Sequence, residues 1–175
     1  MKNKFIVMLA LLMLLPIGPA YAGKAKANKP IISRYSADLN GDGSKQIIEV
    51  ENKTADEPLW LVTVKQKKNS KEPIDSITII GKMAKIEFKD FNFDRQQRII
   101  VYFDGKDNIS NIVIYQLKNN RLAKIFSAAS TYGIEGNFNS FARVRIGKAV
   151  QRDKTPNLAP DWDTWVWAED KFIKE

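Results

Sequence analysis

The feature of this chain that most restricts its fold is a series of short apolar runs rich in β-branched residues. Turn-forming residues such as Gly81, Asp104-Gly105 and Asn119-Asn120 separate neighbouring runs. No window of about twelve residues after the N-terminal segment keeps the apolar i, i+3, i+4, i+7 spacing of a helix. The sequence therefore predicts an all-β, mainly antiparallel domain of about ten to twelve strands. Seven of these strands are placed at residues 46–50, 59–64, 76–80, 98–103, 111–115, 143–146 and 164–167.

The N-terminal segment has the pattern of a signal peptide. Lys2 and Lys4 precede an apolar run at 5–15 that is short for a membrane span, and Ala20-Tyr21-Ala22 offers small residues at a cleavage site. We expect cleavage after Ala22 and export to the periplasm or the medium, with an uncleaved membrane anchor as the alternative. No later stretch is long and apolar enough to span a membrane. The predicted organisation is a signal peptide at 1–22, a basic tail at 23–30 and one all-β domain at 31–175.

The composition excludes several classes of function. The chain contains no histidine and no cysteine, which removes Ser-His and Cys-His catalysis and the ordinary zinc sites. The formal net charge is +8, but the basic residues are scattered, and 65–68 is the only dense basic run. Nucleic-acid binding needs a concentrated basic face with aromatic or polar readers. We therefore expect no nucleic-acid partner.

A turn-and-strand unit recurs along the chain at roughly 50-residue spacing, which is the size of a propeller blade. Asp38, Asp90 and Asn137 begin the three units, with Asp or Asn at alternate positions, and a strand follows each turn. The first two units match well, and the third contains no carboxylate. Three blades are fewer than in an ordinary propeller. The predicted fold is therefore a small propeller, an open propeller-like stack of sheets, or a sandwich.

The first unit contains a candidate calcium loop, DLNGDG. Side chains at alternate positions of a tight loop converge on one point, and calcium prefers oxygen ligands. The candidate ligands are Asp38, Asn40 and Asp42, the backbone carbonyl of Ser44 and the side chain of Gln46. With two carboxylates, we expect one calcium ion bound with moderate to low affinity.

Two other interpretations of this loop stay open. An EF-hand needs an apolar residue at its eighth position and flanking helices, but that position is Lys45 and the residues after it alternate like a strand. Glu49 does stand at the twelfth position. Alternatively, the loop is only a turn, because Asp, Asn and Gly are the commonest turn residues.

The first unit, residues 36–50, resembles the FG-GAP or VCBS-type repeat of integrin-α-like β-propellers in exported bacterial proteins. The resemblance extends more loosely to 89–103 and 136–146, and the closing segment 162–172 is similar to the aromatic strand and turn that end such domains. It implies a calcium-binding loop between two strands of a blade. The second unit departs from the pattern, with Arg95 in place of the glycine and Arg98 four residues after Asp94. We expect these guanidinium groups to pair with Asp90 and Asp94 and to leave that loop without metal.

The C-terminal tryptophans allow a second functional hypothesis. Trp165 and Trp167 alternate along one strand face, and we expect that face to be core. If Trp162, Trp165 and Trp167 were exposed, they could stack on sugar rings. Asp161 and Asp163 are the candidates for a carboxylate pair in glycoside hydrolysis. The leading hypothesis is a non-catalytic, calcium-binding interaction module for a protein or a surface glycan, with carbohydrate binding as the alternative and glycoside hydrolysis as a weaker one.

Overall fold

The computed structural model describes residues 32–53, 58–139, 141–149 and 161–175. The predicted signal peptide, the cleavage site and the basic tail lie outside these residues. The described part of the chain contains no helix that is long and apolar enough to cross a membrane.

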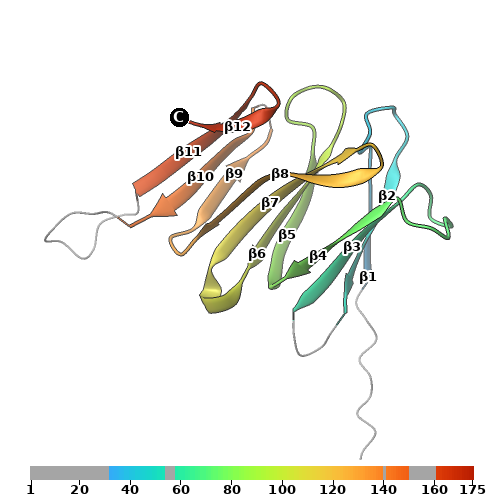
Figure 1. Cartoon of the computed structure of the whole chain (residues 1–175), viewed down its shortest axis with the longest axis horizontal. Coiled ribbons are helices and arrows are strands. Elements are labelled where there is room, and N and C mark those ends of the chain that lie inside the picture. The colour runs from blue at the N-terminus through green and yellow to red at the C-terminus, as the bar shows by residue number, and fades with distance from the viewer. Residues whose placement is uncertain (1–31, 54–57, 140, 150–160) are drawn as a thin grey trace, which may run out of the picture.

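The described residues form twelve strands in three antiparallel sheets (Figure 1). The first sheet consists of β1 (Ile32–Ala37), β2 (Gln46–Asn52), β3 (Leu59–Lys65) and β4 (Asp75–Ile80). The second consists of β5 (Lys82–Lys89), β6 (Arg98–Asp104), β7 (Ser110–Lys118) and β8 (Arg121–Ser130). The third consists of β9 (Ile134–Asn137), β10 (Arg143–Lys148), β11 (Asp161–Ala168) and β12 (Lys171–Lys174).

The architecture confirms the predicted fold class. All seven predicted strands lie within observed strands, and the only helical element among the described residues is a short 3-10 turn, η1 (Lys106–Asn108). In every sheet the strands are neighbours in the order in which they occur along the chain, so each sheet is a four-stranded meander. None of the three closes into a barrel. The result is an open, propeller-like row of three sheets.

The second sheet lies between the other two, and each of its faces carries a core (Figure 1). Ile99 and Val101 of β6 pack toward the first sheet, whereas Ile100 between them packs toward the third. Successive side chains of a strand point to opposite faces, so the interior of a strand that is covered on both sides is apolar at every position. This explains the unbroken apolar run of β6.

Residues with positive φ make the tight connections between strands. Asn119 and Asn120 join β7 to β8 with φ of 51° and 57°, values that asparagine tolerates in a two-residue hairpin. Gly81, between the first and second sheets, has φ of 141°, and a Cβ there would lie 2.5 Å from the carbonyl oxygen of Asp104. Only glycine fits this junction.

Candidate metal centre

Three loops occupy the same place in their sheets, and the first two are rich in Asp and Asn. The first loop (residues 38–45) joins β1 to β2, the second loop (90–97) joins β5 to β6, and the third loop (138–142, with residue 140 not described) joins β9 to β10. Each connects the first strand of a meander to the second. The first and second loops lie at the same edge of the molecule, uppermost in Figure 1. The repeat predicted from the sequence thus corresponds to one such loop in each sheet.

In the first loop, the carboxylate of Asp38 organises the backbone. Its two oxygens accept hydrogen bonds from the amides of Gly41 and Gly43, both at 2.8 Å. These glycines have φ of 76° and 87°. Such left-handed conformations let the backbone curl around the carboxylate, and glycine adopts them without steric penalty.

The remaining candidate ligands face one another across the first loop. Asp42 accepts the Ser44 amide at 2.7 Å on Oδ1 and the Asn40 side-chain amide at 2.8 Å on Oδ2. The hydrogen bond from the Ser44 amide is the largest of the causes that lower the pKa of Asp42, so this carboxyl is ionised at neutral pH. Nε2 of Gln46 donates to Asn40 Oδ1 at 3.1 Å and to the Ser44 carbonyl at 3.2 Å.

Gln46 presents its amide nitrogen to the centre of the first loop. Its Oε1, which the sequence analysis assigned as a ligand atom, accepts a hydrogen bond from the Leu39 amide at 2.7 Å. The side chain is fully buried. A half-turn of the terminal amide would exchange the two groups, because a glutamine side chain carries both a donor and an acceptor, and it would break the hydrogen bond from the Leu39 amide.

The second loop repeats two of the three hydrogen bonds from backbone amides to carboxylates that shape the first. The Arg95 amide donates to Asp90 Oδ2 at 2.9 Å, as the Gly43 amide donates to Asp38, and the Gln96 amide donates to Asp94 Oδ1 at 2.8 Å, as the Ser44 amide donates to Asp42. Phe93 and Arg95 take φ of 59° and 69°, although neither is glycine. The second loop therefore keeps the conformation of the first without its glycines.

The guanidinium group of Arg98 lies at the centre of the second loop. Its Nη1 donates to Asn92 Oδ1 and Asp94 Oδ1, both at 2.6 Å, and to the carbonyl of Gln96. Its Nη2 donates to Asp94 Oδ2 at 2.6 Å, and Nη1 lies 3.8 Å from Asp90 Oδ1. The Arg98 side chain is 1% exposed. Partial burial raises the pKa of Asp94, but the hydrogen bonds from Arg98, Gln96 and Asn92 outweigh it, so the pKa falls below its ordinary value.

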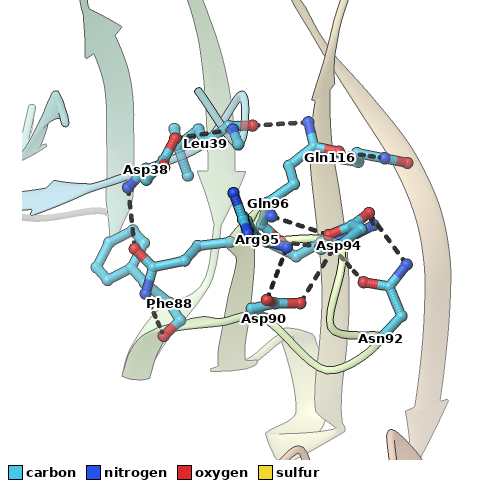
Figure 2. Close-up of polar contacts among 12 residues, drawn as sticks. Asp38, Leu39, Phe88, Asp90, Asn92, Asp94, Arg95, Gln96 and Gln116 are labelled. Atoms are coloured by element: carbon cyan, nitrogen blue, oxygen red, sulfur yellow. Dashed lines mark hydrogen bonds and ion pairs between the residues drawn. The ribbon is translucent and has the colours of Figure 1, made fainter. Parts of the chain in front are cut away.

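The predicted ion pairing of the second loop thus comes from one of the two arginines. Arg98 forms a close ion pair with Asp94 from inside the loop and lies 3.8 Å from Asp90. Arg95 is exposed and contacts Asp90 through its backbone amide (Figure 2). The positions differ because Arg98 begins the buried strand β6 and packs against Phe91, whereas Arg95 lies in the exposed turn.

The third loop has a different construction. Asn137, which the sequence analysis aligned with Asp38, is the last residue of β9 and pairs with Arg143 in the ladder. The loop that follows is shorter than the other two. Its side-chain contacts include the Asn139 amide donating to Asn137 Oδ1 at 3.2 Å and Lys89 Nζ donating to Asn139 Oδ1 at 3.1 Å. With amide oxygens and no carboxylate, it lacks the charge that a cation site requires.

The first loop lies at the seam between the first and second sheets, a feature that the sequence analysis missed. The Asp38 amide donates to Gln97 Oε1 at 2.9 Å, and the Gln97 amide donates to the Asp38 carbonyl at 2.7 Å. Nε2 of Gln96 donates to the carbonyls of Leu39 and Leu117 at 2.7 and 2.6 Å. An ion in the first loop would therefore be bound next to an inter-sheet junction.

The second residue of each unit is a buried apolar residue that packs between two sheets as a wedge, which the sequence analysis also missed. Leu39 is buried in the core between the first and second sheets, and Phe91 and Phe138 are buried in the core between the second and third. The signal was present as the repeated pattern of Asp or Asn, then Leu or Phe, then Asn. These wedges fix the loops against the neighbouring sheet.

The C-terminal tryptophans lie on both faces of β11. Trp165 and Trp167 pack against the apolar core of the third sheet, as expected, and Trp165 contacts Phe126. Trp162 is on the other face, with the Arg145 guanidinium 4.6 Å from its ring centroid. The three rings therefore do not share one surface on which a sugar could stack.

The candidate carboxylate pair is engaged in ion pairs. Asp163 contacts Lys148 at 2.7 Å and Lys174 at 2.8 Å, and Asp161 lies 3.7 Å from Lys148. The hydrogen bond from Lys148, followed by the one from Lys174, lowers the pKa of Asp163. A general acid needs a raised pKa, so this geometry does not favour Asp163 in that role.

The described residues contain no group of three or more His, Cys, Asp or Glu side chains arranged to hold a metal ion. The first loop would rely instead on two carboxylates supplemented by amide and backbone oxygens. No family model, curated protein or solved structure matches the chain. The resemblance to FG-GAP and VCBS repeats therefore stays a prediction from the sequence.

Proposed function

We propose that the protein is an exported, non-catalytic β-repeat domain that binds one calcium ion in the first loop and acts as an interaction module. The observation that carries this proposal is the geometry of the second loop. There, oxygens of Asn92, Asp94 and Gln96 converge on one cationic nitrogen. The first loop shares two backbone hydrogen bonds with the second and places Asn40, Asp42 and Ser44 at the equivalent positions, which supports a cation between them.

The donor set of the first loop fits calcium better than a transition metal. All candidate ligand atoms are oxygens, with two carboxylates, one or two side-chain amides and a backbone carbonyl, and calcium prefers such oxygens. The Asp38 and Asp42 oxygens that accept backbone amides keep further lone pairs. The ion would supply the positive charge that Arg98 supplies in the second loop.

The proposed role of the ion is to stabilise the junction of the first two sheets. Asp38 is both a candidate ligand and a backbone partner of Gln97 in the second sheet. An ion that binds only the folded protein stabilises the fold by mass action. Calcium would therefore fix the first sheet against the second.

An exposed aromatic pair near these loops supports an interaction role. Phe93 in the second loop and Phe141 in the third are 67% and 77% exposed, and their ring centroids lie 6.4 Å apart in an edge-to-face arrangement. Phe93 also has the left-handed φ that bulky residues avoid. An exposed, strained phenylalanine contributes little to folding, so we assign this pair to the binding of a protein or surface-glycan partner.

Thermal unfolding in EDTA and in millimolar calcium tests the proposal. Calcium at about 100 times its Kd should raise the midpoint of the wild type by about 5 to 10 °C. Asp42→Asn should lose this rise, because it removes charge without removing the carboxylate of Asp38 that organises the loop backbone. Asp170→Asn, in the exposed turn between β11 and β12, is the matched control and should keep the rise. A wild type that does not respond, or an Asp42→Asn variant that responds fully, would overturn the proposal.

A further inference from the structure

We infer that Arg98 is the resident cation of the second loop and that its guanidinium group excludes metal from a site of the same design as the first. This inference rests on the proposed calcium site for the metal that an opened second loop would take. The occupation of the loop by Arg98 rests on the geometry alone.

Arg98 and Gln46 occupy corresponding positions in the two loops. Gln46 is the first residue of β2 and Arg98 is the first residue of β6, and both side chains are buried. Gln46 donates to the side-chain oxygen of Asn40 and to the carbonyl of Ser44. Arg98 donates to the corresponding two oxygens, those of Asn92 and Gln96. The two side chains therefore fill the same place in the two loops.

The two side chains differ in the charge that they bring to the centre of the loop. Arg98 adds hydrogen bonds to both oxygens of Asp94, whereas Gln46 has no such bond to Asp42 among the contacts of the first loop. Oδ1 of Asp90 is buried, has no hydrogen-bond partner among the described residues, and lies 3.8 Å from Arg98 Nη1. A buried carboxylate oxygen of this kind needs a positive charge nearby. The guanidinium group meets that need in the second loop.

The two side chains also differ in the groups that they can offer to a metal. A guanidinium group is positively charged and has hydrogen-bond donors but no acceptor, so it cannot bind a metal ion. The Gln46 amide is neutral, and it can present its oxygen if its terminal amide turns away from the Leu39 amide. The residue at this one position therefore decides whether the loop is closed by the protein or open to an ion.

The backbone of the second loop already has the conformation of the first loop. Phe93 and Arg95 adopt the left-handed conformations that Gly41 and Gly43 adopt in the first loop. Replacing Arg98 with glutamine would therefore leave the backbone arrangement and the ligand positions in place. It would also leave Asp90 and Asp94 without their internal counter-ion.

Calcium stoichiometry by isothermal titration calorimetry tests the inference on the full chain. We expect the wild type to bind one ion, Arg98→Gln to bind two, and Gln46→Arg to bind none. Arg95→Gln removes an exposed arginine of the same loop and serves as the matched control, with one ion expected. Unfolding with and without calcium supplies the second readout: calcium should not raise the midpoint of Gln46→Arg, although the lost acceptor for the Leu39 amide lowers that midpoint in EDTA.

The outcomes separate this inference from the proposed function. A wild type without calcium refutes the proposed function, but an Arg98→Gln variant that gains one ion would still support the inference. A folded Arg98→Gln variant that binds no more ions than the wild type would overturn the inference, whatever the wild type binds. If Arg98→Gln does not fold, Gln46→Arg decides, and calcium binding by that variant at the wild-type level would overturn the inference.

Discussion

Replacement of Arg98 by methionine should destabilise the protein strongly. Methionine replaces the aliphatic stem of arginine but not its guanidinium group, so the loss combines the missing ion pairs with the space that the guanidinium group vacates. The guanidinium group donates four hydrogen bonds within the second loop, two of them to Asp94. Removing one partner of a buried ion pair costs roughly 3 to 5 kcal/mol. Asp94 is 39% exposed and regains some hydration, so we expect a loss near the lower limit, about 3 kcal/mol.

Urea unfolding at pH 7 in EDTA measures this loss, with Arg95→Met as the control. Arg95 has the same side chain three residues earlier, but it is exposed and contacts Asp90 through its backbone. Its replacement should change the free energy of unfolding by less than about 0.5 kcal/mol. In the Arg98→Met background, Asp94→Asn should recover part of the loss, because it removes the unpaired charge. A loss below about 1 kcal/mol for Arg98→Met, or equal losses for the two arginines, would refute this account of the second loop.

Three further predictions concern the wedge, the strained loop residue and acid stability. Leu39→Ala should lower the free energy of unfolding by about 3 kcal/mol, because the side chain is fully buried between two sheets; a urea-unfolding loss under about 1 kcal/mol would contradict its role as a wedge. Phe93→Gly should raise the free energy of unfolding by about 0.5 to 1 kcal/mol, because glycine adopts the left-handed φ without strain. A clear destabilisation would show instead that the exposed ring stabilises the fold. The pKa values of Asp94 and Glu49 are depressed in the folded protein, so their stabilisation is complete above the unfolded pKa and declines as pH falls through the folded pKa. Unfolding measured between pH 7 and pH 2 should show this decline below about pH 4, and Arg98→Met should show a smaller one; an equal decline would exclude the contribution of Asp94.

Local sequence pattern was sufficient to predict the fold class and most of the strands. The β-branched runs match β2, β3, β4, β6, β7, β10 and β11, and the Asn119-Asn120 hairpin lies where the turn residues placed it. The less apolar edge strands were harder to predict. β5 has the sequence KMAKIEFK, in which Met83 and Lys85 flank a register shift, and this irregularity breaks the alternation that a strand prediction uses.

The candidate site was only partly predictable, because its decisive features are long-range. The sequence placed Asp38, Asn40 and Asp42 in one turn and paired Arg98 with the second loop. It could not place Arg98 inside that loop, because β6 is buried on both faces and the side chain's direction depends on which face packs against the third sheet. The contacts of Gln96 and Gln97 with the first loop join residues of different sheets, and spacing along the chain contains no information on such contacts.

The central claim is that the first loop binds calcium while the second is closed by the protein itself. The most direct test is a calcium titration of the ¹⁵N-labelled protein followed by amide NMR. Gly41 and Gly43 report on the first loop, and Arg95 reports on the equivalent place in the second. The account predicts that the two glycine amides shift and saturate at one equivalent of bound calcium, while the Arg95 amide stays in place. Glycine amides that do not move at millimolar calcium would contradict it.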